Sequence, residues 1–358
     1  MAGGDAQPDA GTTTITDAEP VADTAPMAAV GPRREEPASA GRPSAPVTLA
    51  FGGDVHFERW IDTAVRTDPQ RALQPLAGLL GDADLAVVNL ETAITWRGTP
   101  APKHYTFRGP EHGLLALASA GVDVVSVANN HSMDFGTQGL ADTQAAAGAS
   151  GLGLIGGGRN HAEAYRPHVT DIHGRRVAVI GATQVLDNYA TTAWAAGPNR
   201  AGLASAKVER DGLPRLLNAV RNADADADTV VVMLHWGRHN TTCPQARQQQ
   251  LAAQLREAGA DIIVGGNAHR LAGGGYLGDT VVNYGLGNLV LWVRREPAVT
   301  SGVLAVTIEP DDTTSMTWRP AVLRDGVATS VQGPAVEPAL ADWERLRGCT
   351  DLAPAPQT

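Results

Sequence analysis

Five apolar segments of this sequence each run into side chains that can bind a metal ion or transfer a proton. These side chains are Asp54 with His56, Glu91, Asn130 with His131, His235, and Asn267 with His269. Carboxylate, imidazole and amide groups suit zinc, manganese or iron, and an imidazole beside a metal can transfer a proton. One such residue after a strand is typical of a helix cap or turn. Because the pattern recurs, we interpret it as a dinuclear metal centre in which one carboxylate bridges two ions that activate water.

The segments that must position these groups read as buried strands, since they are apolar and rich in β-branched residues. The five strands are expected at 47–51, 85–90, 124–128, 229–234 and 261–264. Between and around them, helices are expected at about 69–80 (capped by Asp68), 110–120, 137–147, 206–223 and 244–258. Alternating strands and helices indicate an α/β fold, in which ligands bind where the strands end.

Smaller features complete this expected organisation. A hairpin is predicted over 169–180, a flexible glycine turn at 156–158, a lid-like loop at 187–202 and further strands between 280 and 322. Three domains are expected: a disordered Ala/Pro/Gly-rich tail at 1–46, the folded domain at 47–335, and a short helix with a frayed tail at 336–358.

Composition excludes several classes of function. The 358-residue chain has a net charge of −10 and no basic cluster in its folded part, so nucleic acid is an unexpected partner. Cys243 and Cys349 are too few for a disulfide framework or a thiolate metal site, and a single bridge between them is left open. The sequence shows neither a transmembrane run nor a signal peptide, which favours a cytoplasmic protein, unless the true start is missing.

Residues 103–110 combine cations with aromatic rings. Lys103 and Arg108 are suited to an anionic substrate, and the ordinary alternative is a surface hairpin with solvated charges. The residues expected to contact substrate are Lys103, Tyr105, Arg108, Asn129 and Trp236.

Five motifs resemble those of one known family. They are Gly53-Asp54, Asn89-Leu90-Glu91, Ala128-Asn129-Asn130-His131 with Asp134 and Gly136, His235-Trp236-Gly237, and Tyr284-Gly285-Leu286-Gly287-Asn288. In this order they resemble the CapA family of poly-γ-glutamate capsule biosynthesis proteins, which belongs to the calcineurin-like metallophosphatase superfamily. The resemblance covers about 47–291. It implies a calcineurin-like α/β sandwich with two mixed β-sheets flanked by helices.

The resemblance also implies roles for individual residues. One divalent ion (Mn, Fe or Zn) would be held by Asp54, His56, Glu91 and His269. The second, weaker site would use Glu91, Asn130, His235 and Asn267. His131 would donate a proton to the leaving group, and Asp134 would orient its imidazole.

This sequence departs from the family pattern at three residues. His56 stands where the family commonly has Met, Asn267 where it usually has His, and His239 where an acidic residue often follows. The membrane anchor that is usual in the family is not visible either.

Two functions remain in competition. The first is a metal-dependent hydrolase that acts on a phosphoester or on a γ-glutamyl or amide-linked acidic substrate in poly-γ-glutamate-type metabolism. The second is a non-catalytic assembly partner of a poly-γ-glutamate-type ligase, with a vestigial metal site. A dinucleotide-binding domain is disfavoured, because no glycine fingerprint follows the first strand.

Overall fold

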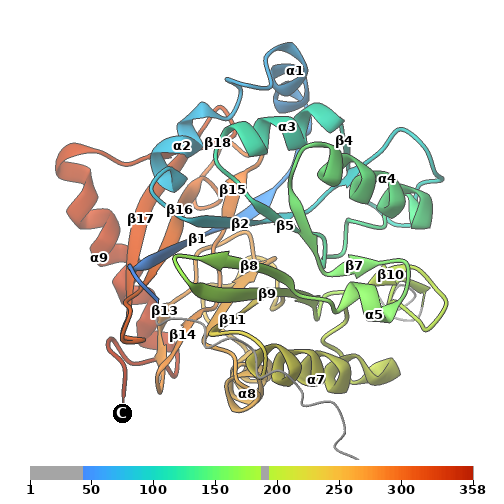
Figure 1. Ribbon diagram of the computed structural model, residues 1–358. Helices are drawn as coiled ribbons and strands as arrows, with labels where there is room; N and C mark the ends of the chain where they lie inside the picture. Colours follow the sequence, from blue (N-terminus) through green and yellow to red (C-terminus); the bar gives the residue numbers. More distant parts are fainter. Residues whose placement is uncertain (1–42, 187–192, 358) are drawn as a thin grey trace, which may run out of the picture. The chain divides into compact units, whose positions relative to one another are not determined.

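The computed structural model describes residues 43–186 and 193–357 (Figure 1). Most of the expected N-terminal tail, part of the expected loop at 187–202 and Thr358 lie outside these residues. The described residues all lie in one compact unit.

Two mixed β-sheets make up the centre of this unit (Figure 1). The larger has eight strands in the order β15 (Asn288–Val290), β18 (Val327–Ser330), β17 (Thr314–Arg324), β16 (Thr300–Ile308), β1 (Val47–Val55), β2 (Leu85–Leu90), β5 (Val124–Ser126) and β6 (Gly153–Ile155). The smaller has six, β13 (Gly274–Leu277), β14 (Thr280–Asn283), β12 (Ile262–Gly266), β11 (Thr229–His235), β9 (Arg175–Thr183) and β8 (His168–Ile172). In each sheet the inner strands that lead to the site pair in parallel, and antiparallel strands flank them.

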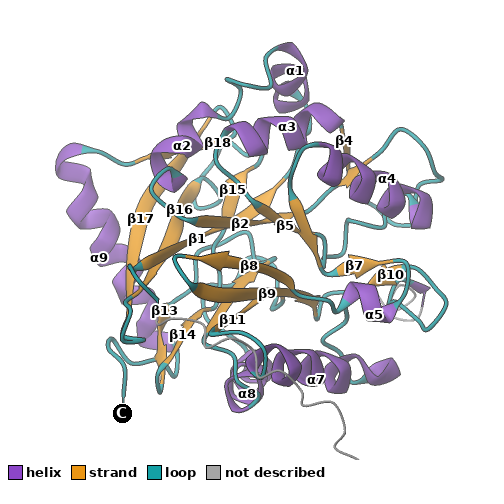
Figure 2. Ribbon diagram, viewed as in Figure 1, coloured by secondary structure: helices purple, strands orange, loops and turns teal. Residues whose placement is uncertain are grey.

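Helices cover the outer face of each sheet (Figure 2). The larger sheet is covered by α1 (Trp60–Thr67), α2 (Gln74–Leu80), α3 (Glu111–Ser119) and α4 (Gly136–Ala149). The smaller is covered by α5 (His161–Ala164), α7 (Gly212–Asp224) and α8 (Ala246–Glu257), while α9 (Val336–Leu346) packs beside β17. The predicted fold, two mixed sheets flanked by helices, is confirmed.

The apolar core has one layer between the sheets and one under each set of helices. Leu49 and Phe51 of β1 pack in the central layer with Val231 of β11, whereas Ala50 packs under the helices of the larger sheet. Because side chains alternate along a strand, both faces of β1 are buried, and its sequence is accordingly apolar throughout. This double burial holds the strand ends in fixed positions.

The first predicted helix differs from the observed structure. Residues 69–73 form turns, and α2 begins only at Gln74, with Pro75 in its first turn, where proline costs no helix hydrogen bond. Asp68 is the C-cap residue of α1 rather than the N-cap of the predicted helix. The helix α1 itself was not predicted.

The glycine turn expected at 156–158 is partly a strand. Gly157–Gly158 forms β7, which pairs with β10 (Gly202–Leu203). A Cβ atom on Gly157 would lie 2.7 Å from Val127 Cγ2, so the close approach explains the glycine better than flexibility does.

The C-terminal segment is held in place rather than frayed from Leu352. Leu352 is buried, and Ala353 exchanges two backbone hydrogen bonds with Tyr276. A disulfide bond joins Cys243 to Cys349, with the Cα atoms 5.6 Å apart. No helix in the described part of the chain is long and apolar enough to span a bilayer.

Candidate metal centre

The carboxyl ends of four strands from the two sheets place the candidate site. Asp54 lies near the end of β1, Glu91 directly follows β2, His235 ends β11, and His269 follows β12. Across β1 and β2, Asp54 pairs with Asn89, and the parallel register keeps the two strand ends level. These positions are where the sequence pattern placed the polar residues, because each apolar run stops at the same edge of its sheet.

Glu91 lies at the middle of this cluster and is fully buried. Its Oε2 atom is 3.0 Å from His56 Nε2 and 3.9 Å from His269 Nε2, and its Oε1 atom is 3.3 Å from His235 Nε2. His269 Nδ1 is also 3.2 Å from Asp54 Oδ2. One carboxylate thus faces three imidazoles from three different strand ends.

The charges in this cluster are strongly coupled. Burial raises the pKa of the Glu91 carboxyl, but His269 and His235 outweigh burial and hold this pKa well below its usual range. Burial lowers the pKa of His269, but Glu91 and Asp54 together raise it to about 9. The Glu91 carboxylate is therefore ionised, as a metal ligand must be.

These residues fit a divalent metal ion. Asp54, Glu91 and His269 offer ligand atoms that all lie within 4.8 Å of one another. His56 Nδ1 is buried without a hydrogen-bond partner, which is unusual for a buried polar atom. Oxygen and imidazole nitrogen donors together suit zinc, manganese or iron.

Two asparagines that sequence reasoning left out of the site hold its ligand-type residues. Asn89 Nδ2 donates to Asp54 Oδ1 at 2.7 Å and lies 3.0 Å from His235 Nδ1. Asn288 Oδ1 lies 2.7 Å from His269 Nδ1, while its Nδ2 donates to Ala298 O. The sequence did offer a signal for these two asparagines. Each has its amide inside or directly before an apolar strand, where a buried polar group without a hydrogen-bond partner would destabilise the fold.

The residues expected at a second ion are linked to one another and to neighbouring groups by hydrogen bonds. Asn130 Oδ1 is 2.7 Å from His235 Nε2. Asn267 Nδ2 donates to the carbonyls of Trp236 and Gly237, and Asn267 Oδ1 is 2.9 Å from His239 Nε2. The amide of Asn267 is therefore fully engaged with the protein.

His131 lies beside the cluster with two charged neighbours. Its Nδ1 atom is 2.7 Å from Asp134 Oδ2, and Lys103 Nζ is 2.7 Å from Asp134 Oδ1. Burial lowers the pKa of His131, although its hydrogen bond with Asp134 opposes the change. The Lys103 side chain is 9% exposed and its Nζ atom also donates to the Asn130 carbonyl, so it supports this dyad.

The other expected substrate contacts are also mostly internal. Trp236 is fully buried, and its Nε1 atom donates to the Tyr284 carbonyl. The Arg108 guanidinium lies 3.7 Å from the centre of the Phe135 ring. Asn129 is fully buried and donates to Asn89 Oδ1, whereas Arg108 is partly buried and Tyr105, which is 64% exposed, is the most open of the five.

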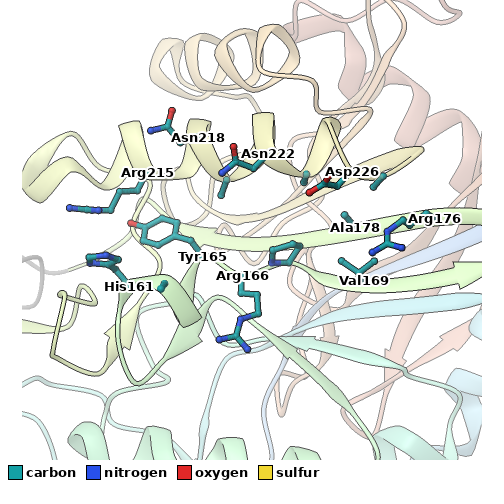
Figure 3. Close-up of a pocket in the computed structure, with 15 residues that line it drawn as sticks. His161, Tyr165, Arg166, Val169, Arg176, Ala178, Arg215, Asn218, Asn222 and Asp226 are labelled. Atoms are coloured by element: carbon teal, nitrogen blue, oxygen red, sulfur yellow. The ribbon is translucent and has the colours of Figure 1, made fainter. Parts of the chain in front are cut away.

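A cavity of about 470 Å³ lies away from these residues, between α7, α5 and the β8–β9 hairpin (Figure 3). Its lining includes Arg166, Arg176, Arg215 and Tyr165, whose hydroxyl donates to the Ser205 carbonyl. None of the predicted site residues lines it.

Comparisons with known proteins agree with the sequence motifs. A family profile described as bacterial capsule synthesis protein PGA_cap matches residues 48–291. The PGA biosynthesis protein CapA of Bacillus subtilis (strain 168) is 29% identical over 255 residues, covering 69% of this chain and 65% of that protein. A probable polyglutamine synthesis accessory protein of Mycobacterium tuberculosis (strain CDC 1551 / Oshkosh) is 30% identical over 189 residues, covering 52% of this chain and 50% of the relative. The match thus spans less than two thirds of either relative's length.

Among solved structures, a 5'-nucleotidase from Candida albicans SC5314 is similar with a TM-score of 0.42 and 13% identity. The match covers 76% of this chain and 52% of the nucleotidase. A likeness at this level carries no information on activity.

Proposed function

Because the chain belongs to the family of bacterial capsule synthesis proteins PGA_cap, we propose that it is a metal-dependent hydrolase in poly-γ-glutamate-type metabolism. Its substrate would be a γ-glutamyl or other amide-linked acidic compound, or a phosphoester. The observation that carries this proposal is the buried Glu91 carboxylate among three imidazoles, one of which also contacts Asp54. Such a cluster is costly to bury unless a bound ion or a reaction uses it.

The proposed ligands divide between two divalent ions. Asp54, His56, Glu91 and His269 would hold the first, and Glu91, Asn130, His235 and Asn267 the second. When bound, such ions polarise the oxygens of the substrate and lower the pKa of water. Because the Asn267 amide already bonds to His239 and two carbonyls, we expect the second ion to bind more weakly.

The chain's own residues would supply the proton. His131 would donate a proton to the leaving group, and Asp134 Oδ2 accepts from His131 Nδ1, which fixes the ring. The Lys103 ammonium in turn holds Asp134 through its other oxygen. In this arrangement Lys103 and Asp134 are positioning residues for His131.

The test combines metal analysis with an activity screen. Purified protein should bind zinc, manganese or iron, and should hydrolyse a γ-glutamyl peptide or a p-nitrophenyl phosphate ester. His131→Ala should reduce turnover without lowering the bound metal, whereas the exposed histidine variant His112→Ala should change neither. Equal loss of turnover in both variants would contradict the assigned role of His131.

The second candidate is a non-catalytic accessory protein of a polymer-forming ligase. The engaged Asn267 amide favours it, because a weakened second ion would impair hydrolysis. The Mycobacterium tuberculosis relative is itself named a probable accessory protein. Absence of turnover with every divalent ion, together with loss of polymer synthesis when the chain is removed, would support this role.

A further inference from the structure

A cleft of about 560 Å³ lies next to the candidate metal centre. Its lining includes four arginines, two tryptophans and one glutamate, and we call it the arginine cleft. These residues are Arg59, Arg270, Arg294, Arg295, Trp60, Trp292 and Glu296. None of the residues expected from the sequence to contact substrate belongs to this set.

The arginine cleft and the candidate metal centre share backbone segments. Arg270 directly follows His269, and its Nη1 atom donates to the His269 carbonyl at 2.8 Å. Asn288 contacts His269 Nδ1 through Oδ1 and donates through Nδ2 to the carbonyl of Ala298, which lines the cleft. A ligand in the cleft would therefore lie beside the strand ends that carry the cluster.

Two of the four guanidinium groups lie over indole rings, and the one carboxylate of the lining, Glu296, accepts a hydrogen bond from Thr300 Oγ1. Arg59 lies 4.0 Å from the ring centre of Trp292, and Arg294 lies 4.0 Å from that of Trp60. Within the described residues, none of the four arginines forms an ion pair with an Asp or Glu side chain. A guanidinium stacked on an indole keeps its in-plane N–H groups available to a carboxylate.

This arrangement differs from that of many other arginines in the chain. Arg66, Arg97, Arg159 and Arg319 each pair with a nearby acidic side chain. In a chain with a net charge of −10, a cleft lined by four arginines and one glutamate is a local positive region. Like charges repel, and an anionic ligand relieves this repulsion.

We propose that the arginine cleft binds successive carboxylates of an extended acidic chain and presents that chain to the candidate metal centre. The four arginines come from three separate segments and line one open cleft, which suits several carboxylates better than one small anion. A γ-linked glutamate chain carries one free carboxylate per residue. The choice of this ligand rests on the proposed function, whereas binding itself requires no hydrolysis.

The experiment measures binding of a synthetic γ-linked glutamate oligomer to the full chain by titration calorimetry. The variant Arg294→Gln/Arg295→Gln should weaken binding about tenfold or more, the order expected for lost charge-assisted hydrogen bonds. The same oligomer with its carboxylates amidated should not bind. The control Arg166→Gln/Arg215→Gln removes equal charge from the other cavity (Figure 3) and should leave the affinity unchanged. Thermal unfolding of both variants verifies that they fold.

Three outcomes would overturn the proposal: no binding of the oligomer, equal weakening in both double variants, or undiminished binding of the amidated oligomer. Binding of vesicles containing phosphatidylglycerol, lost in Arg294→Gln/Arg295→Gln while the oligomer does not bind, would assign the cleft to a membrane surface instead. The two proposals fail separately. Cleft-dependent binding without any turnover would refute only the hydrolase, and turnover of a p-nitrophenyl ester without oligomer binding would refute only the cleft.

Discussion

The Glu91 carboxylate and the His269 imidazole stabilise each other's charged forms. In the metal-free protein the pKa of His269 is raised to about 9, with Glu91 the first of the groups that raise it. Glu91→Gln removes that negative charge, so the pKa of His269 should fall towards its ordinary value and the ring should lose its proton at lower pH. An NMR pH titration of chelator-treated protein checks this. An unchanged titration would show that Asp54 and Asn288, without Glu91, set the charge of His269.

Asn89 is fixed between two groups that the cluster needs. Asn89→Leu removes the donor to Asp54 and leaves buried polar atoms unpaired. The free energy of unfolding should therefore fall by about 1–3 kcal/mol. Metal affinity should fall as well, because Asp54 and His235 lose their alignment. Urea unfolding and metal titration measure the two effects. The exposed Asn222→Leu is the matched control and should change neither.

The ligand-type residues could be predicted from sequence because each follows an apolar strand, and the strand ends meet. The surroundings of Lys103 and Trp236, in contrast, could not be predicted from the sequence. The acidic partner of Lys103 is Asp134, in another segment, and a sequence pattern does not reveal which cation a carboxylate will meet. Likewise, a tryptophan after a strand end can face substrate or core, and here Tyr284 lies against Trp236 with ring centres 5.5 Å apart.

Among the elements, the long apolar strands were predictable and the short helices were not. The five expected strands correspond to β1, β2, β5, β11 and β12. Helix α1 has only eight residues, so its stability depends on burying Ile61 and Val65 rather than on local propensity. Such tertiary stabilisation leaves little signal in the sequence.

Strand β12 tests how tightly the elements are packed around the site. A Cβ atom on Gly265 would lie 2.0 Å from Trp236 Nε1, whereas one on Gly148 of α4 meets nothing within 4 Å. Gly265→Ala should therefore destabilise the protein by about 1–3 kcal/mol through overpacking. Gly148→Ala should stabilise it by about 0.5–1 kcal/mol, since alanine favours a helix interior. Chemical denaturation compares them, and similar effects of the two changes would contradict this packing.

At the scale of the whole molecule, one covalent bond closes a long loop. Cys243 and Cys349 are 106 residues apart, and the chain between them includes β12 to β17 and α9. Reduction, or the change Cys243→Ser/Cys349→Ser, should lower the free energy of unfolding by about 2–4 kcal/mol, because the unfolded chain gains freedom. Thermal unfolding with and without reductant measures the loss. The double serine variant should no longer respond to reductant, and a response would implicate another effect of the reagent.

The same bond determines what a single protease cut does to the chain. If the backbone is cut at one point between Cys243 and Cys349, both fragments stay joined, and one band is expected on a denaturing gel without thiol. Adding thiol would separate it into two bands. The amino-terminal fragment always carries Asp54, Glu91 and His235, and a cut between His269 and Cys349 leaves His269 on it too. On such a gel, nicked protein can therefore be mistaken for intact protein unless the disulfide is reduced first.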